Sequence, residues 1–142
     1  MFISHLIIFP NMSQEMDDEG KLCSMIMEAN QYARFAAVCD REGKILCNSH
    51  RNNVEHLLTQ EETNESLKRA VESWHSRDNL TEKLGNGRYA VVGYDNLTRI
   101  TVPLKNDHLL LVTVEGKKPQ YLGDIINIVD YVQKHPLSCM RK

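Results

Sequence analysis

Three β-rich segments that follow one another almost without a gap place the strongest constraint on how this chain can fold. They span residues 88–94, 97–105 and 108–115, and only Asp95-Asn96 and Asn106-Asp107 separate them. Two-residue loops that contain Asn or Asp favour tight hairpin turns, because these residues tolerate the left-handed backbone that such turns require. The pattern therefore predicts a three-stranded antiparallel meander.

The last of these segments is apolar on both of its alternating faces. Leu109 and Leu111 fall on one face, whereas Leu110 and Val112 fall on the other. A strand without a polar face is typical of the middle of a covered sheet. In the preceding strand, Pro103 cannot donate to the hydrogen-bond ladder, which predicts a bulge or an unpaired end there.

A second hairpin is expected nearer the N-terminus. Residues 34–39 and 44–48 have strand-like patterns, and the four residues 40–43 between them supply a turn that ends in a glycine. In this hairpin Cys39 and Cys47 fall out of direct register, which disfavours a disulfide between them.

Helical periodicity predicts three helices around these strands. Apolar side chains recur at helical spacing in residues 15–30 and again in residues 121–135. The long middle helix begins at a capping box, in which Thr59 and Glu62 satisfy each other's backbone donors. Gly85-Asn86-Gly87 is expected to end it.

These segments predict an α+β fold with a five-stranded antiparallel sheet and the element order α-β-β-α-β-β-β-α. No repeat or long linker divides the chain, so residues 15–135 are expected to form one domain and residues 136–142 a short tail. Residues 1–14 are expected to be an extension. Either translation begins at Met12 or Met16, or the segment is an apolar tail or an added edge strand.

Composition excludes several classes of protein. The 142 residues are 42% apolar and 25% charged, with a net charge of −2, which excludes a disordered or low-complexity chain. The absence of a basic block argues against nucleic acid as a partner. Residues 1–10 form an apolar run too short to span a bilayer and without the features of a signal peptide. We therefore expect a cytoplasmic protein that does not bind membranes.

No group of residues predicts a reaction. The four cysteines, at positions 23, 39, 47 and 139, form no Cys-x-x-Cys pair and are expected to be reduced, mostly buried thiols. Cys47, His50 and His56 are close enough in sequence to suggest a metal site, but no carboxylate lies at ligand spacing. Gly85-x-Gly87 precedes a strand, whereas a phosphate-binding loop joins a strand to a helix. We expect no catalytic residue, metal or cofactor, and hence no enzyme.

The positive candidates are surfaces. Trp74, the single tryptophan, lies on the middle helix, and Tyr89 and Tyr94 lie on the strand that follows. Aromatic residues of this kind are favoured in interfaces, although ordinary packing between helix and sheet is the simpler explanation of Trp74. Five arginines either form a basic edge or serve as solubilising and ion-pairing residues: Arg34, Arg51, Arg77, Arg88 and Arg99.

The order of elements resembles the roadblock and dynein light chain domain, which has a profilin-like architecture. The residue string is similar to that of single-domain roadblock-like proteins of archaea. The resemblance covers residues 21–132 and rests on short matching pieces: Arg34-Phe35-Ala36-Ala37-Val38, Asp40 with Gly43-Lys44, Glu61-Glu62, Lys83-Leu84-Gly85 with Tyr89, Arg99, Pro103-Leu104 and Leu109-Leu110-Leu111-Val112.

The resemblance implies a sheet with the long helix on one face and the terminal helices on the other. It also implies a homodimer, because roadblock domains commonly associate through the long helix and the neighbouring edge strand, and a role as scaffold or regulator of a small GTPase or signalling complex. The expected interface residues are Leu67, Val71, Trp74, Tyr89, Val91 and Tyr94. The alternative is a sensory module like a PAS domain, which would need a cavity for a small molecule between the long helix and the sheet.

Overall fold

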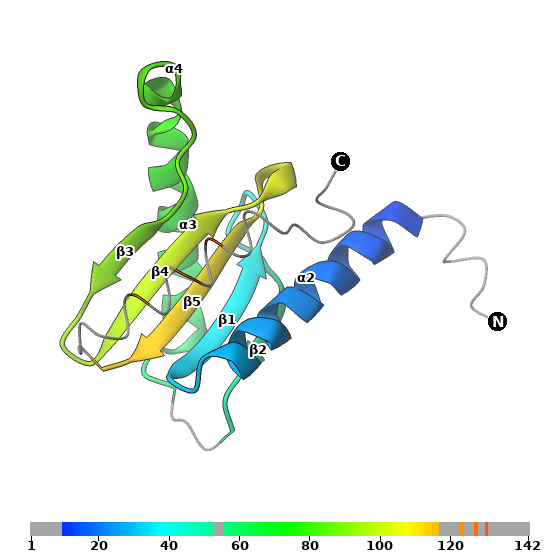
Figure 1. Cartoon of the computed structure of the whole chain (residues 1–142), viewed down its shortest axis with the longest axis vertical. Coiled ribbons are helices and arrows are strands. Elements are labelled where there is room, and N and C mark those ends of the chain that lie inside the picture. Colours follow the sequence, from blue (N-terminus) through cyan, green and yellow to red (C-terminus); the bar gives the residue numbers. More distant parts are fainter. Residues whose placement is uncertain (1–9, 53–55, 117–122, 124–126, 128–129, 131–142) are drawn as a thin grey trace.

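The computed structural model describes residues 10–52 and 56–116 together with Gly123, Asn127 and Asp130. Within these residues, a five-stranded antiparallel sheet has helix α2 on one face and helix α3 on the other (Figure 1). The helices are α2 (Pro10–Ala29), α3 (Gln60–Ser76) and α4 (Thr81–Leu84), with short 3-10 turns at Asp78–Leu80 and Lys105–Asp107. The strands are β1 (Ala33–Cys39), β2 (Ile45–His50), β3 (Ala90–Gly93), β4 (Leu97–Pro103) and β5 (Leu109–Glu115).

The strand order is β2-β1-β5-β4-β3, which confirms the predicted α+β class and the antiparallel sheet. Strands β3, β4 and β5 form the predicted meander, and β1 and β2 form the predicted hairpin. The strand that is apolar on both faces, β5, lies in the centre as expected. Pro103 is the last residue of β4, opposite Leu109, so the missing donor falls at a strand end.

Asn and Asp residues stabilise the predicted turns between β4 and β5 and between β1 and β2. In the loop between β4 and β5, Asn106 and Asp107 adopt positive φ angles of 63° and 61°. In the loop between β1 and β2, Oδ1 of Asp40 accepts hydrogen bonds from the backbone N–H groups of Glu42 and Lys44, each at 2.9 Å. The positive φ angles of Asn106 and Asp107 and the side-chain bonds of Asp40 explain why the sequence alone indicated these two turns.

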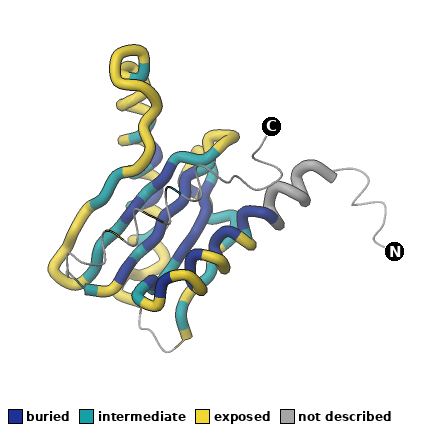
Figure 2. Tube along the Cα trace, in the orientation of Figure 1, coloured by how far each residue is buried: buried dark blue, intermediate teal, exposed yellow. Residues whose placement is uncertain are grey.

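The sheet separates two apolar cores. One core joins α2 to the sheet and contains Leu22, Ile26, Val38, Ile100 and Leu110 among its buried residues. The other joins α3 to the opposite face through Leu67, Val71, Cys39, Leu109 and Leu111. Figure 2 shows buried residues along the central strands and along the side of α2 that faces them, whereas most of the α3–α4 projection is exposed.

A buried polar contact fastens α2 to the sheet. Glu19, with 1% of its surface exposed, lies on α2, and its Oε2 is 2.7 Å from Nδ1 of His108, at the start of β5. Because a buried carboxylate is costly without polar partners, this contact favours one position of the helix along the sheet.

Helix α3 begins as predicted and ends earlier. The side chain of Thr59 accepts from the backbone N–H of Glu62, and the Glu62 carboxylate accepts from the backbone N–H of Thr59, which confirms the capping box. The helix ends at Ser76, and a 3-10 turn leads into α4, which ends at Gly85 with a φ of 87°. The predicted glycine stop is therefore correct, but it ends α4 and not one continuous helix.

The ends of the chain are described only in part. Helix α2 begins at Pro10, before the predicted start at Glu15. Gly123, Asn127 and Asp130 are helical, and the other residues of the predicted helix 121–135 lie outside the described residues, as do 1–9 and 136–142. The predicted domain boundaries and start codon stay predictions. In the described part of the chain, no helix has both the length and the apolar character needed to cross a membrane.

Candidate interaction surface

Strand β3 forms one edge of the sheet, and exposed apolar side chains lie in it and directly beside it. It pairs with β4 in the register Val91 to Ile100 and Val92 to Arg99. Val92 and Tyr94 are 50% and 54% exposed, and Tyr89, just before the strand, is 37% exposed. An edge strand that presents apolar side chains and an open backbone can pair with another strand.

The residues of β3 divide between the two faces of the sheet. Val91 is half-buried and packs against the core beneath α2. Because side chains alternate along a strand, Val92 and Tyr94 lie on the face that carries α3. The exposed side chains of Val92 and Tyr94 therefore lie on the same face as the long helix.

Trp74 packs between α3 and the sheet. Its indole Nε1–H donates a hydrogen bond to Oγ1 of Thr101, at 2.9 Å, and the Arg77 guanidinium lies over its ring, 4.7 Å from the centroid. Gly87 lies so close that a Cβ atom there would be 2.3 Å from Cζ3 of the indole. The half-buried Trp74 thus fits the core-packing explanation while keeping part of its surface exposed.

The other helix residues expected in the interface are already buried within the chain. Leu67 is 0% exposed and Val71 is 5% exposed, and both pack against the sheet. They fix the position of α3 on the sheet. Only exposed side chains nearby can contact a partner directly.

An open groove of about 810 Å³ lies on the α3 face of the sheet. It runs between the N-terminal part of α3 and the end of the sheet at which β1 begins and β5 ends. Its floor includes Phe35, Ile45 and Leu111 from three strands. Leu57 and Leu58, from the segment before α3, contribute an apolar rim and are 49% and 41% exposed. Tyr94 also lines it, so the groove reaches the β3 edge.

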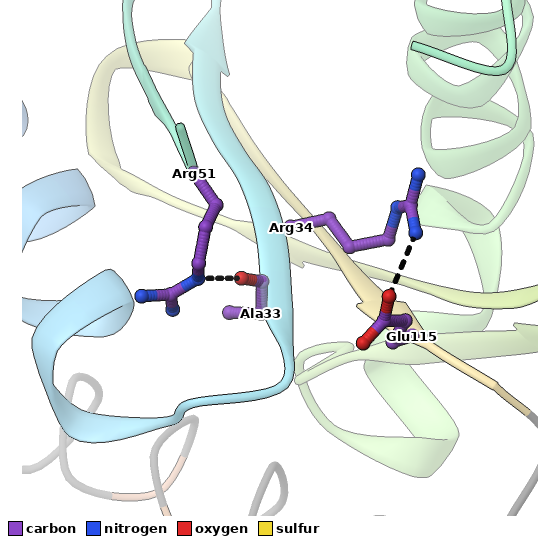
Figure 3. Close-up of polar contacts among 4 residues, drawn as sticks. All are labelled: Ala33, Arg34, Arg51 and Glu115. Atoms are coloured by element: carbon purple, nitrogen blue, oxygen red, sulfur yellow. Dashed lines mark hydrogen bonds and ion pairs between the residues drawn. The ribbon is translucent and has the colours of Figure 1, made fainter. Parts of the chain in front are cut away.

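The arginines of the groove are held by contacts within the chain. Arg34 forms an ion pair with Glu115 at 3.1 Å (Figure 3). Arg51 donates through Nε to the carbonyl of Ala33 at 3.0 Å (Figure 3) and through Nη2 to two carbonyls at the end of α2. Arg99 donates to Oγ of Ser66 at 3.0 Å and so joins β4 to α3.

The remaining two arginines of the predicted basic edge lie elsewhere. Arg77 stacks on Trp74, and Arg88 forms an ion pair with Asp130. The alternative of ion-paired and solubilising arginines therefore describes these residues better than a free basic edge does. The anchoring role of Arg51 was not predicted, because nothing in its sequence neighbourhood indicates which carbonyls it reaches.

The residues considered for a metal site separate in the structure. The rings of His50 and His56 are near each other, with centroids 5.5 Å apart, whereas Cys47 packs against the core beneath α2. Among the described residues, no three His, Cys, Asp or Glu side chains are grouped so that they could hold a metal ion. Cys39 lies in the α3-side core, and burial raises the pKa of its thiol to about 11, which keeps it protonated and unreactive.

An antiparallel sheet of this order, with a long helix on each face, defines the profilin-like class of α+β domains. Solved structures similar to this chain include a Roadblock/LC7 domain and two MglB proteins, and the chain has the roadblock-like fold. No protein-family model and no curated protein sequence matches the chain.

Three of these structures illustrate the likeness. The gliding protein MglB of Thermus thermophilus has a TM-score of 0.62 at 10% identity, over 84% of this chain and 88% of that one. MglB of Myxococcus xanthus has a TM-score of 0.59 at 12% identity, over 90% and 94%. A Roadblock/LC7 domain from Streptomyces avermitilis has a TM-score of 0.54 at 15% identity, over 82% and 95%. The predicted roadblock-like fold is confirmed. The similarity to roadblock-like proteins of archaea stays a prediction.

Proposed function

We propose that this chain is a non-catalytic interaction module that works as a homodimer. The observation that carries the proposal is the exposed β3 edge, which presents Val92 and Tyr94 on the same face as α3. Two copies related by a two-fold axis can pair their β3 strands antiparallel and extend the sheet, because such an axis brings the same edge of both chains together.

The long helix contributes indirectly. Leu67 and Val71 hold α3 on the sheet, and Trp74 connects the helix to β4 through Thr101. With Tyr89, Val91 and Tyr94, these residues form the proposed interface region. A further structure of MglB has a tetrameric arrangement, which supports self-association as a property of this fold.

Sedimentation of the purified chain tests the dimer. We expect a dimer at micromolar concentration and a shift to monomer in Val92→Lys, because a lysine on an edge strand opposes pairing with a second strand. The matched control is Asn48→Lys, an exposed position on β2, the opposite edge of the sheet, which should remain dimeric. A wild-type monomer, or a dimer that Asn48→Lys disrupts and Val92→Lys does not, would contradict the proposal.

We further propose that the dimer serves as a scaffold or regulator of a small GTPase. This role follows from the resemblance to roadblock proteins, and cytoplasmic localisation is proposed with it. Binding of small GTPases from the same genome, purified with GDP or with a non-hydrolysable GTP analogue, provides the test. Binding that depends on the nucleotide favours a regulator, and binding to both forms favours a passive scaffold. If no GTPase binds, this part of the proposal fails while the dimer stands or falls by sedimentation.

The groove favours one alternative, a sensory module like a PAS domain, since it provides space beside α3 for a small molecule. The likeness to roadblock structures favours the interaction module. Native mass spectrometry distinguishes them, because a retained small molecule that Phe35→Ala releases would support sensing.

A further inference from the structure

Two of the cysteines come together in the structure. Cys23 lies on the buried face of α2 and is 0% exposed, whereas Cys47 lies half-buried on β2. The two thiols are near enough for each to shift the pKa of the other, and both cysteines are free. They meet in the core between α2 and the sheet.

An irregularity in β2 makes this contact possible. Cys39 pairs with Ile45 and Val38 pairs with Cys47, so Leu46 is an extra residue in the ladder. Without a bulge, Ile45 and Cys47 would lie on the same face of the sheet. Instead, Ile45 packs against the core beneath α3 and Cys47 against the core beneath α2. The bulge therefore directs Cys47 away from Cys39 and toward Cys23.

A neighbouring contact locates the same crossing independently. Oγ of Ser24 lies 3.4 Å from Oγ of Ser49, which is two residues beyond Cys47 along β2. Helix α2 thus passes close to β2 at two successive points.

The two thiols differ in acidity. The hydrogen bond with Cys47, together with burial, raises the pKa of Cys23, and the same hydrogen bond lowers the pKa of Cys47. The carboxylate of Glu19 opposes ionisation of both thiols. Cys47 is therefore the thiol that ionises first, and it is also the one with surface exposed to solvent.

We propose that Cys23 and Cys47 form a redox-modification site at which a small hydroperoxide produces a disulfide between α2 and β2. The thiolate of Cys47 attacks one peroxide oxygen, the O–O bond breaks, and Cys47 becomes a sulfenic acid while hydroxide leaves and takes up a proton. The thiol of Cys23 then loses its proton and attacks the Cys47 sulfur. The S–S bond forms as water leaves, so two thiols lose two electrons and hydrogen peroxide is reduced to two waters.

A small oxidant fits this site better than a protein disulfide does. Only Cys47 is partly exposed, and Cys23 is fully covered by the core, so the second thiol can react only from within the chain. The resulting bond would tie α2 to β2, at the side of the sheet opposite the β3 edge. The site is thus independent of the proposed dimer.

Hydrogen peroxide added to the purified full chain tests the proposal. Free thiols counted in denaturant should fall from four to two, and peptide mapping without reductant should recover one linked peptide pair containing Cys23 and Cys47. Cys39→Ala is the matched control, because it removes a buried cysteine from the other core and should still form the linked pair. Cys47→Ser changes a half-exposed position, so we expect the variant to fold, which circular dichroism checks. It should form no intrachain link.

Several results would overturn the proposal. These are retention of all four thiols, a link between other cysteines, a disulfide between two chains, or a sulfinic acid at Cys47 with Cys23 still reduced. The melting temperature provides a second readout. A rise in Tm on oxidation, reversed by dithiothreitol, supports a bond that fits the native crossing, and a fall in Tm contradicts it.

Discussion

The carboxylate of Glu19 and the imidazole of His108 meet at 2.7 Å in the core between α2 and the sheet, although 89 residues separate them along the chain. Glu19 is 1% exposed, so its charge depends on polar groups supplied by the fold. This contact therefore couples the position of α2 to the start of the central strand β5.

We expect His108→Ala to lower the free energy of unfolding by about 3 kcal/mol, because it removes this partner from a buried carboxylate. The double variant Glu19→Gln with His108→Ala should recover part of the loss, since a neutral amide is less costly to bury. Urea denaturation of the four chains measures the coupling. Strictly additive losses would show that the two residues act independently.

The close approach of Gly87 to Trp74 predicts a second effect on stability. In Gly87→Ala the new methyl group would overlap the indole, and displacing the ring would also disturb its hydrogen bond to Thr101. We expect a loss of about 1–3 kcal/mol, measured by urea denaturation. Gly20→Ala is the matched control, because nothing lies within 4 Å of the added methyl group and alanine is the better helix former. Equal losses in both variants would contradict the clash.

The capping box predicts that two threonines, four residues apart in the sequence, differ in their contribution to stability. Thr59→Ala should lower the free energy of unfolding by about 1 kcal/mol, because the backbone N–H of Glu62 loses its acceptor. Thr63→Ala, one turn into α3, should have little effect or a small stabilising one, since alanine favours helix interiors. Thermal melts of the two variants test this, and an unchanged Tm in Thr59→Ala would count against the cap.

Burial of Cys39 predicts a loss of stability at alkaline pH. Its thiol has a pKa of about 11 in the fold against 9.0 for an unperturbed cysteine. Between these values the unfolded chain releases a proton that the folded chain retains, so unfolding becomes more favourable as the pH rises from 9.0 to about 11. Below pH 9.0 the contribution is constant.

Urea titrations at several pH values measure this slope. Cys39→Ala should flatten it relative to the wild type, and Cys139→Ser, which changes a cysteine outside the described residues, provides the comparison. A slope that Cys39→Ala leaves unchanged would show that other groups cause the alkaline destabilisation.

Local chemistry determined much of this fold without any tertiary contact. The Asx loops, the capping box at Thr59 and the two apolar faces of residues 109–115 each act over a few residues, so the hairpins, the start of α3 and the central strand were all predictable. The order of elements then sufficed to indicate a roadblock-like sheet.

Only the tertiary structure decided which side chains meet across the sheet. A single extra residue, Leu46, places Ile45 and Cys47 on opposite faces of the sheet, and no sequence signal marks such a bulge in advance. The same is true of Glu19 with His108, and of Arg51 with the carbonyls at the end of α2. These contacts depend on where α2 lies on the sheet, and that position results from packing of the whole core, which no local pattern encodes.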